Sequence, residues 1–226
     1  MRNFLFLLSL VSFLAFGAKA EVYFSAEAIS PLLISGPLAR NSSLYKSEVS
    51  YMIKLQKNID MLELKEAIFE DEKLAPEIVT KDVIPEMARS DFPKLYKLLD
   101  KTASSTLEVS ENAKKFWNTK RPYLEDKRIK LLVKPYANGS YPSSHSAVAQ
   151  SVARILGLLF DEKREALLNR AEEIAKHRSL VGVHYPHDLQ GGREVAFLVV
   201  GALMANGDFL EDFENAKQEV IQKIKK

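Results

Sequence analysis

The histidines of this sequence are confined to two short stretches. The chain has only four histidines among 226 residues. Three of them, His177, His184 and His187, lie in HRSLVGVHYPHD, and the fourth, His145, lies in YPSSHS. Because imidazole titrates near neutral pH, this grouping predicts a reactive site to which both stretches contribute.

The stretch that ends at Asp188 contains the residue types of a nucleophile and its support. His184 lies just before Pro186, a natural first helical residue, so we expect His184 on a loop and Asp188 in the first helical turn. A carboxylate bonded to one ring nitrogen leaves the other lone pair free to attack. Arg178 offers a planar fork for phosphate oxygens. Two alternatives are a simple helix-start acid at Asp188 and a metal site that also uses His187.

The stretch GSYPSSH predicts an anion site at the start of a helix. Unpaired N–H groups and the positive end of the helix dipole favour an anion there. Ser143 or Ser144 can cap the helix, which would explain the serines without a ligand. An imidazolium in this first turn is disfavoured unless an anion is near. His145 would then be placed to protonate a leaving group beside that anion.

Two further cations, Lys114 and Arg121, lie seven residues apart in KKFWNTKRP. On a continuous helix they would be two turns apart on one face, where they repel each other unless an anion lies between them. The alternative is a solvated basic face, because Lys115 and Lys120 lie nearby.

Helical spacing of apolar residues dominates the sequence from Leu44 onward, and no strand alternation is evident. FPKLYKLLDKTA and TLEVSENAKKFWNTKR are expected to be two separate helices, the second ending at Pro122. A helix from Pro186 to about Ala205 is apolar on all sides, so we expect it to be the central buried helix. The sequence predicts an all-α fold, a single-domain helical bundle.

The chain is expected to begin with a secretory signal peptide at residues 1–20. Arg2 precedes the apolar run FLFLLSLVSFLAFGA, and AKA ends at Ala20 with small residues at the cleavage positions. The alternative is an uncleaved membrane anchor, for which the run is short. We expect an N-terminal arm at 21–43, a helical domain at 44–226, and a mature chain in the periplasm or outside the cell.

The composition limits the classes of partner and the kinds of chemistry that we expect for this chain. The formal charge is +2, and removal of Arg2 and Lys19 reduces it to 0, which gives no reason to expect a nucleic-acid partner. The chain has no cysteine, which excludes thiol catalysis and cysteine-rich metal sites. The mature chain offers no apolar run long enough for stable membrane insertion.

In order and spacing, the motifs Lys114-x6-Arg121-Pro122, Pro142-Ser-Ser-His145 and Arg178-x5-His184-x3-Asp188 resemble the signature of the phosphatidic acid phosphatase type 2 superfamily. The size and GSYPSSH make the chain most similar to the bacterial class A non-specific acid phosphatases, which are related to vanadium haloperoxidases. The resemblance implies a helical bundle of that type and an acid phosphatase that hydrolyses phosphate monoesters without metal or cofactor. It also suggests a homodimer.

The resemblance also implies roles. His184 would be the nucleophile that forms a phosphohistidine, Asp188 would orient it, and His145 would protonate the leaving group. Five residues would hold the phosphate: Lys114, Arg121, Ser143, Ser144 and Arg178. Acid–base chemistry by histidines predicts an optimum at roughly pH 5–6.5.

The chain departs from the family pattern at two positions. Ser144 stands where the family usually has glycine, and His177 stands where it usually has serine. A side chain at Ser144 would crowd the phosphate or restrain the backbone, whereas His177 is a candidate accessory donor to phosphate. Two other functions stay open: a vanadate-dependent haloperoxidase, and a phosphate- or phospholipid-binding protein with weakened catalysis.

Overall fold

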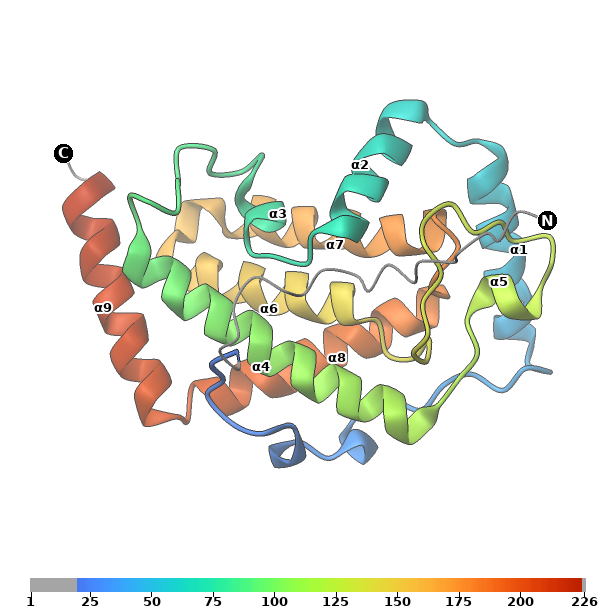
Figure 1. Cartoon of the computed structure of the whole chain (residues 1–226), viewed down its shortest axis with the longest axis horizontal. Helices are drawn as coiled ribbons and strands as arrows, with labels where there is room; N and C mark the ends of the chain where they lie inside the picture. Colours follow the sequence, from blue (N-terminus) through green and yellow to red (C-terminus); the bar gives the residue numbers. More distant parts are fainter. Residues whose placement is uncertain (1–19, 225–226) are drawn as a thin grey trace, which may run out of the picture.

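The computed structural model describes residues 20–224, which are helical and contain no strand (Figure 1). The expected all-α fold is therefore confirmed, whereas the predicted signal peptide lies almost entirely outside the described residues. The α-helices of this part are α1 (Ser43–Lys57), α2 (Met61–Glu72), α3 (Glu77–Thr80), α4 (Pro93–Trp117), α5 (Pro122–Glu125), α6 (Ser144–Leu159), α7 (Arg164–Leu180), α8 (Pro186–Leu203) and α9 (Gly207–Ile224).

The predicted N-terminal arm, residues 21–43, contains two short 3-10 helices, Ala26–Ala28 and Pro31–Leu33, and runs into the start of α1. The Tyr23 N–H donates to the hydroxyl of Ser105 on α4 at 3.0 Å. The division between this arm and a domain at 44–226 stays a prediction. Within the described residues, no helix combines the length and apolarity that crossing a bilayer requires.

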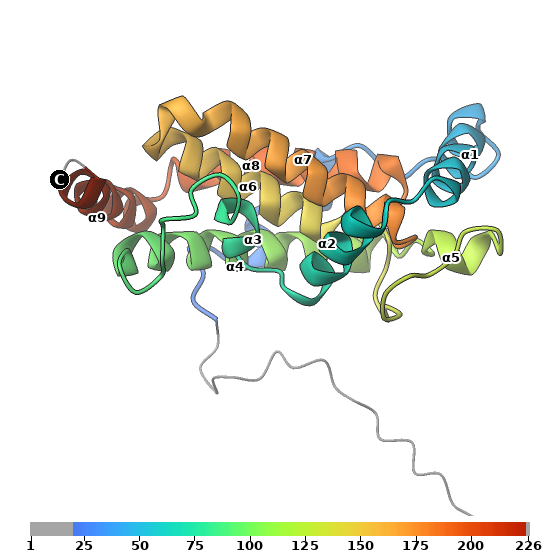
Figure 2. The ribbon, with the colours of Figure 1, turned by 90° about the horizontal axis from the view of Figure 1, so that it is seen from above.

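Four helices, α4, α6, α7 and α8, form the body of the bundle (Figures 1 and 2). Helix α9 lies at one end of this body and α1 and α5 lie at the other, while α2 lies alongside the body and packs against α7. The most completely buried helix is α6, in which every residue from Ser144 to Gly157 except Arg154 is buried. The expectation that α8 is the central helix was wrong, because Phe197 on its outer face is 62% exposed.

Helix α4 differs from the expectation in length and in its end. It is one helix of 25 residues, not two. Its polar run is accommodated inside the bundle, since the buried hydroxyls of Thr106 and Ser110 each donate to the carbonyl four residues earlier. The helix ends at Trp117, and Asn118 takes a left-handed conformation with φ 43°. Arg121 lies outside the helix, so the predicted shared helix face of Lys114 and Arg121 was wrong.

Helix α8 approaches the start of α6 closely at a pair of glycines. A Cβ added at Gly191 would lie 2.4 Å from the Tyr141 ring, and one at Gly192 would lie 2.6 Å from the Ser143 carbonyl oxygen. The absence of these side chains lets the segment that carries His184 and Asp188 pack directly against GSYPSSH.

We expect Gly192→Ala to destabilise the fold by about 1–3 kcal/mol, because the added methyl group overlaps the backbone of the α6 start. Gly201→Ala on the same helix is the matched control, since its Cβ would meet no atom within 4 Å. That change should be neutral or stabilising by up to about 1 kcal/mol. Urea unfolding measures both, and equal midpoints would contradict the close packing.

Candidate active site

The three sequence motifs meet at one end of the bundle, where α4 and α7 end and α6 and α8 begin (Figure 1). The structure brings seven of the predicted site residues into one buried cluster, which we call the cradle: Lys114, Arg121, Ser143, His145, Arg178, His184 and Asp188. Each of them is at most 7% exposed. Such burial strengthens every charge interaction within the cluster.

His184 and Asp188 form a directed pair at the start of α8. The Nδ1 atom of His184 lies 3.4 Å from Oδ2 of Asp188. That oxygen also accepts from the Ser140 hydroxyl at 2.6 Å and from the Tyr185 N–H at 2.9 Å. Burial raises the pKa of Asp188, and the two donated hydrogen bonds act against this rise. The carboxylate is therefore fixed where it holds a proton on Nδ1.

The other ring nitrogen of His184 faces a cation. Nε2 of His184 lies 3.1 Å from Nη1 of Arg121. A guanidinium only donates, so this contact requires a lone pair on Nε2. Burial and the nearby Arg121 hold the pKa of His184 well below its usual range. His184 is thus a neutral imidazole with its lone pair toward the cations.

His145 lies in the first turn of α6 and faces the same cations. Burial, followed by the charges of Arg178, Lys114 and Arg121, holds its pKa well below the usual range. Its Nε2 atom is buried and has no hydrogen-bond partner among the described residues. An anion placed between these groups would raise the pKa of His145 and favour its acid form.

Lys114 is turned toward the loop before α6. Its Nζ atom donates to the carbonyl oxygens of Gly139 at 3.1 Å, Ser140 at 3.2 Å and Pro142 at 2.6 Å. Burial, together with the charge of Arg121, lowers the pKa of Lys114 to about 7. A buried ammonium next to a second cation indicates a site that favours an anion.

Arg178 is held by helix α2, which sequence reasoning did not connect to the site. Its Nη1 donates to Asp71 at 2.6 Å and its Nη2 to the Ala67 carbonyl at 2.7 Å. The Tyr136 hydroxyl donates to the same Asp71 oxygen at 2.6 Å. The Nε atom of Arg178 is buried without a partner among the described residues. Asp71 lies 107 positions before Arg178, and no local pattern marks it.

Three more of the predicted site residues, Ser143, Ser144 and His177, form hydrogen bonds to residues outside the cradle. The Ser143 hydroxyl caps α6 by accepting from the Ser146 N–H at 3.3 Å. The Ser144 hydroxyl donates to Glu111 at 3.0 Å. His177 faces α2, because its Nδ1 lies 2.7 Å from Glu70. No hydrogen bond of the His177 side chain with a cradle residue accompanies this one among the described residues, and its accessory role in phosphate binding stays a prediction.

His187, the third residue of the metal alternative, lies apart from the cradle. Its Nε2 atom lies 2.8 Å from the Gly36 carbonyl oxygen, and its ring stacks on Tyr141. Within residues 20–224, no group of three or more histidine or acidic side chains lies close enough together to hold a metal ion.

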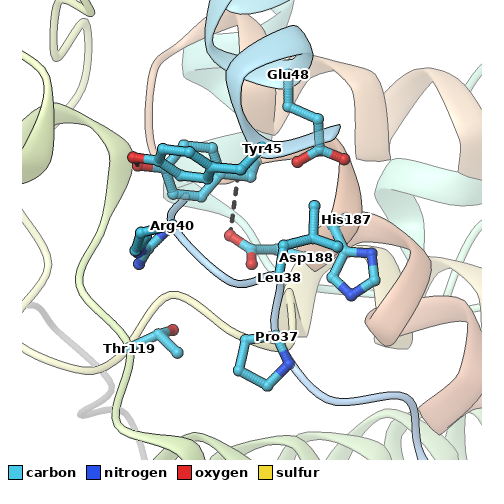
Figure 3. A pocket seen from close by; sticks show the side chains of 9 residues that line it. Pro37, Leu38, Arg40, Tyr45, Glu48, Thr119, His187 and Asp188 are labelled. Atoms are coloured by element: carbon cyan, nitrogen blue, oxygen red, sulfur yellow. Dashed lines mark hydrogen bonds between the residues drawn. The ribbon is translucent and has the colours of Figure 1, made fainter. Parts of the chain in front are cut away.

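A small pocket lies beside the cradle, and Asp188 lines it (Figure 3). Arg40 covers the rings of Tyr45 and Tyr185 at 5.0 and 5.1 Å from their centroids. Glu48 of α1 also lines it, and burial raises the pKa of this carboxyl. This pocket connects the predicted N-terminal arm and α1 to the carboxylate that supports His184.

The sequence is similar to those of known proteins over the segment that contains the three motifs. Residues 101–209 match the PAP2 superfamily. The chain is 30% identical to an acid phosphatase of Zymomonas mobilis over 58% of its own length and 51% of that protein. It is 29% identical to a non-specific acid phosphatase of Providencia stuartii, over 62% and 58% of the respective lengths. The chain thus spans about half the length of these curated relatives.

The fold is also similar to that of solved structures. A bacterial vanadium-dependent iodoperoxidase superimposes with a TM-score of 0.58 at 16% sequence identity, over 76% of this chain and 51% of that one. At this identity the likeness concerns the fold alone. It agrees with the helical bundle expected from the sequence.

Proposed function

We propose that this protein is a metal-independent acid phosphatase that hydrolyses phosphate monoesters through a phosphohistidine on His184. One observation carries the proposal. The Nε2 atom of His184 has a lone pair that faces the Arg121 guanidinium at 3.1 Å, while its Nδ1 atom faces Asp188. A neutral imidazole that points into a group of buried cations suits attack on a phosphoryl group.

In the first half-reaction, Nε2 of His184 attacks phosphorus and the bond from phosphorus to the ester oxygen breaks. His145 gives its proton to the departing oxygen, so an alcohol leaves. Lys114, Arg121 and Arg178 stabilise the charge on the phosphoryl oxygens, helped by N–H groups at the α6 start. Asp188 stabilises the positive charge that develops on the His184 ring.

In the second half-reaction, a water oxygen attacks phosphorus and the bond from phosphorus to Nε2 breaks. The electron pair returns to His184, and His145 accepts a proton from the water. Inorganic phosphate leaves, and both histidines are in their starting states. When the next substrate binds, its phosphoryl anion raises the pKa of His145, which favours the protonated form that the next leaving group requires.

The direct test is hydrolysis of p-nitrophenyl phosphate by the purified mature chain, with and without a chelator. The proposal requires activity that the chelator leaves unchanged. Loss of activity with the chelator would instead support the metal alternative. Halide oxidation on addition of vanadate, without phosphatase activity, would favour the haloperoxidase alternative. Phosphate binding without turnover would favour the binding-protein alternative.

Activity should fall as the pH rises above about 7. Lys114 must carry its charge to hold phosphoryl oxygens, and burial with Arg121 lowers its pKa to about 7. His184 stays neutral in mild acid, because its pKa lies well below the usual range. We therefore expect kcat/KM to decline by up to about tenfold for each pH unit above that point. A profile that still rises above about pH 8 would contradict the assignment.

We further propose that the chain acts in the periplasm or outside the cell after cleavage near Ala20, with small phosphomonoesters as substrates. A homodimer is the proposed assembly. Cell fractionation and light scattering of the mature chain test these two points.

A further inference from the structure

Glu111 of α4 is a carboxylate that none of the three motifs includes, yet it touches two parts of the site. It lies three residues before Lys114 on the same helix. The Ser144 hydroxyl donates to Oε1 of Glu111 at 3.0 Å. The Asn138 side-chain amide donates to Oε1 at 3.1 Å and to Oε2 at 2.9 Å. One carboxylate thus ties α4 to the loop before α6 and to the α6 start.

Asn138 in turn holds Arg121 of the cradle. Its side-chain oxygen accepts from Nη2 of Arg121 at 2.6 Å, and its backbone oxygen accepts from Nε at 3.1 Å. The third nitrogen, Nη1, is the one that reaches Nε2 of His184. Nη1 also donates to the Val183 carbonyl oxygen at 3.1 Å, so Asn138 and Val183 together determine the direction in which Nη1 points.

The Asn138 amide has two ends, and Glu111 determines which end faces Arg121. A carboxylate only accepts, so it binds the NH2 end of Asn138 and leaves the oxygen for the guanidinium. Without Glu111, the amide would lose the contact that orients it, and Arg121 would lose a fixed acceptor. The same carboxylate accepts the hydroxyl of Ser144, so a serine fits where the resembling family usually has glycine.

We propose that Glu111 is a positioning residue of the phosphatase reaction, which fixes Asn138 and through it aims Arg121 at the phosphoryl group. The inference rests on the proposed function. It concerns a residue outside the motifs, and it explains how the Ser144 side chain is accommodated. Glu111 acts through Asn138 and does not touch the substrate.

A double-mutant cycle tests this role. Glu111→Ala and Asn138→Ala should each lower kcat/KM for p-nitrophenyl phosphate by about fivefold, and should weaken inhibition by inorganic phosphate to a similar degree. Because both act through Arg121, the double variant should lie within about twofold of either single one. Independent losses that multiply to about twenty-five-fold would overturn the proposal, as would an unchanged Glu111→Ala enzyme.

The Glu111→Gln variant distinguishes the positioning role of Glu111 from an effect of its negative charge. Glu111→Gln keeps a side-chain oxygen that can accept from Asn138, so we expect it to retain activity within about twofold of the wild type. A loss as large as that of Glu111→Ala would overturn the positioning role, even if the alanine variant folds poorly. Glu108→Ala is the matched control, since Glu108 lies one turn earlier on α4 and the described residues show no hydrogen bond or ion pair to it.

The kinetic results distinguish a wrong role for Glu111 from a wrong proposed function. An active wild-type enzyme with independent losses at Glu111 and Asn138 rejects the inference alone. An inactive wild-type chain rejects the proposed function. In that case, calorimetric binding of inorganic phosphate to the same variants still tests whether Glu111 orients the anion site.

Discussion

Replacing His184 by alanine should reduce turnover of p-nitrophenyl phosphate by at least about a thousandfold, the scale of loss when an enzyme loses its nucleophile. The structure gives the physical reason. The Nε2 lone pair faces Arg121 at 3.1 Å, and no second imidazole of the cradle has a carboxylate at its other nitrogen as His184 has Asp188. The measurement is steady-state kinetics at mildly acidic pH, with circular dichroism to verify folding.

His187→Ala is the matched control for this variant. His187 lies three residues away, and its Nε2 contacts the Gly36 carbonyl outside the cradle. We expect it to retain activity within a few-fold of the wild type. A rapid alkaline quench with labelled substrate adds a second measurement, because it should trap phosphohistidine in the wild type and none in His184→Ala. A labelled His184→Ala chain would show that another residue is the nucleophile.

The sequence predicts those parts of the site that depend on local chemistry. Pro186 indicates a helix start, and the structure begins α8 there, with His184 before it and Asp188 in its first turn. The spacing of four residues between them suffices to bring Nδ1 and Oδ2 together. Likewise, Ser143 precedes α6 as a capping residue should.

The sequence does not predict the parts that depend on tertiary contacts. Asp71 and Ala67 hold Arg178 from a helix about a hundred residues earlier in the chain. Ser140 supports Asp188 across 48 positions. Single acids and serines are common on helices and loops, so nothing in the sequence distinguishes these. Their roles exist only after the bundle packs α2 and the loop before α6 against α7 and α8.

Two of the errors in the helix prediction have a common cause. The predicted division of α4 into two helices falls at Ser104 and Ser105. Inside the bundle, however, the hydroxyls of Ser105, Thr106 and Ser110 bond to the preceding turn, and the helix runs through this polar stretch. Conversely, the apolar run of α8 predicts a central helix, but Phe197 lies on the surface. In both cases the bundle, not the local composition, decides which side chains are buried.

Replacing His145 by alanine should have an effect that depends on the leaving group. For an alkyl phosphate such as glycerol phosphate, the departing oxygen needs a proton, so we expect kcat to fall by about 10²–10⁴-fold. For p-nitrophenyl phosphate, whose leaving group is stable as an anion, we expect a loss of about tenfold or less in the first half-reaction, measured as the burst of nitrophenol. Burial and the charges of Arg178, Lys114 and Arg121 lower the pKa of His145. The role therefore depends on the bound phosphoryl anion, which favours the acid form of this imidazole.

The second half-reaction offers a further measurement on the same variant. His145 is the proposed base for water, so His145→Ala should accumulate phosphohistidine, whereas the wild type turns it over. The variant should therefore show a burst of nitrophenol followed by slow release of phosphate. This result is expected only if the His145 imidazole carries out both proton transfers. Equal losses on both substrates, without accumulation of the intermediate, would assign His145 to binding of the phosphoryl group and not to proton transfer.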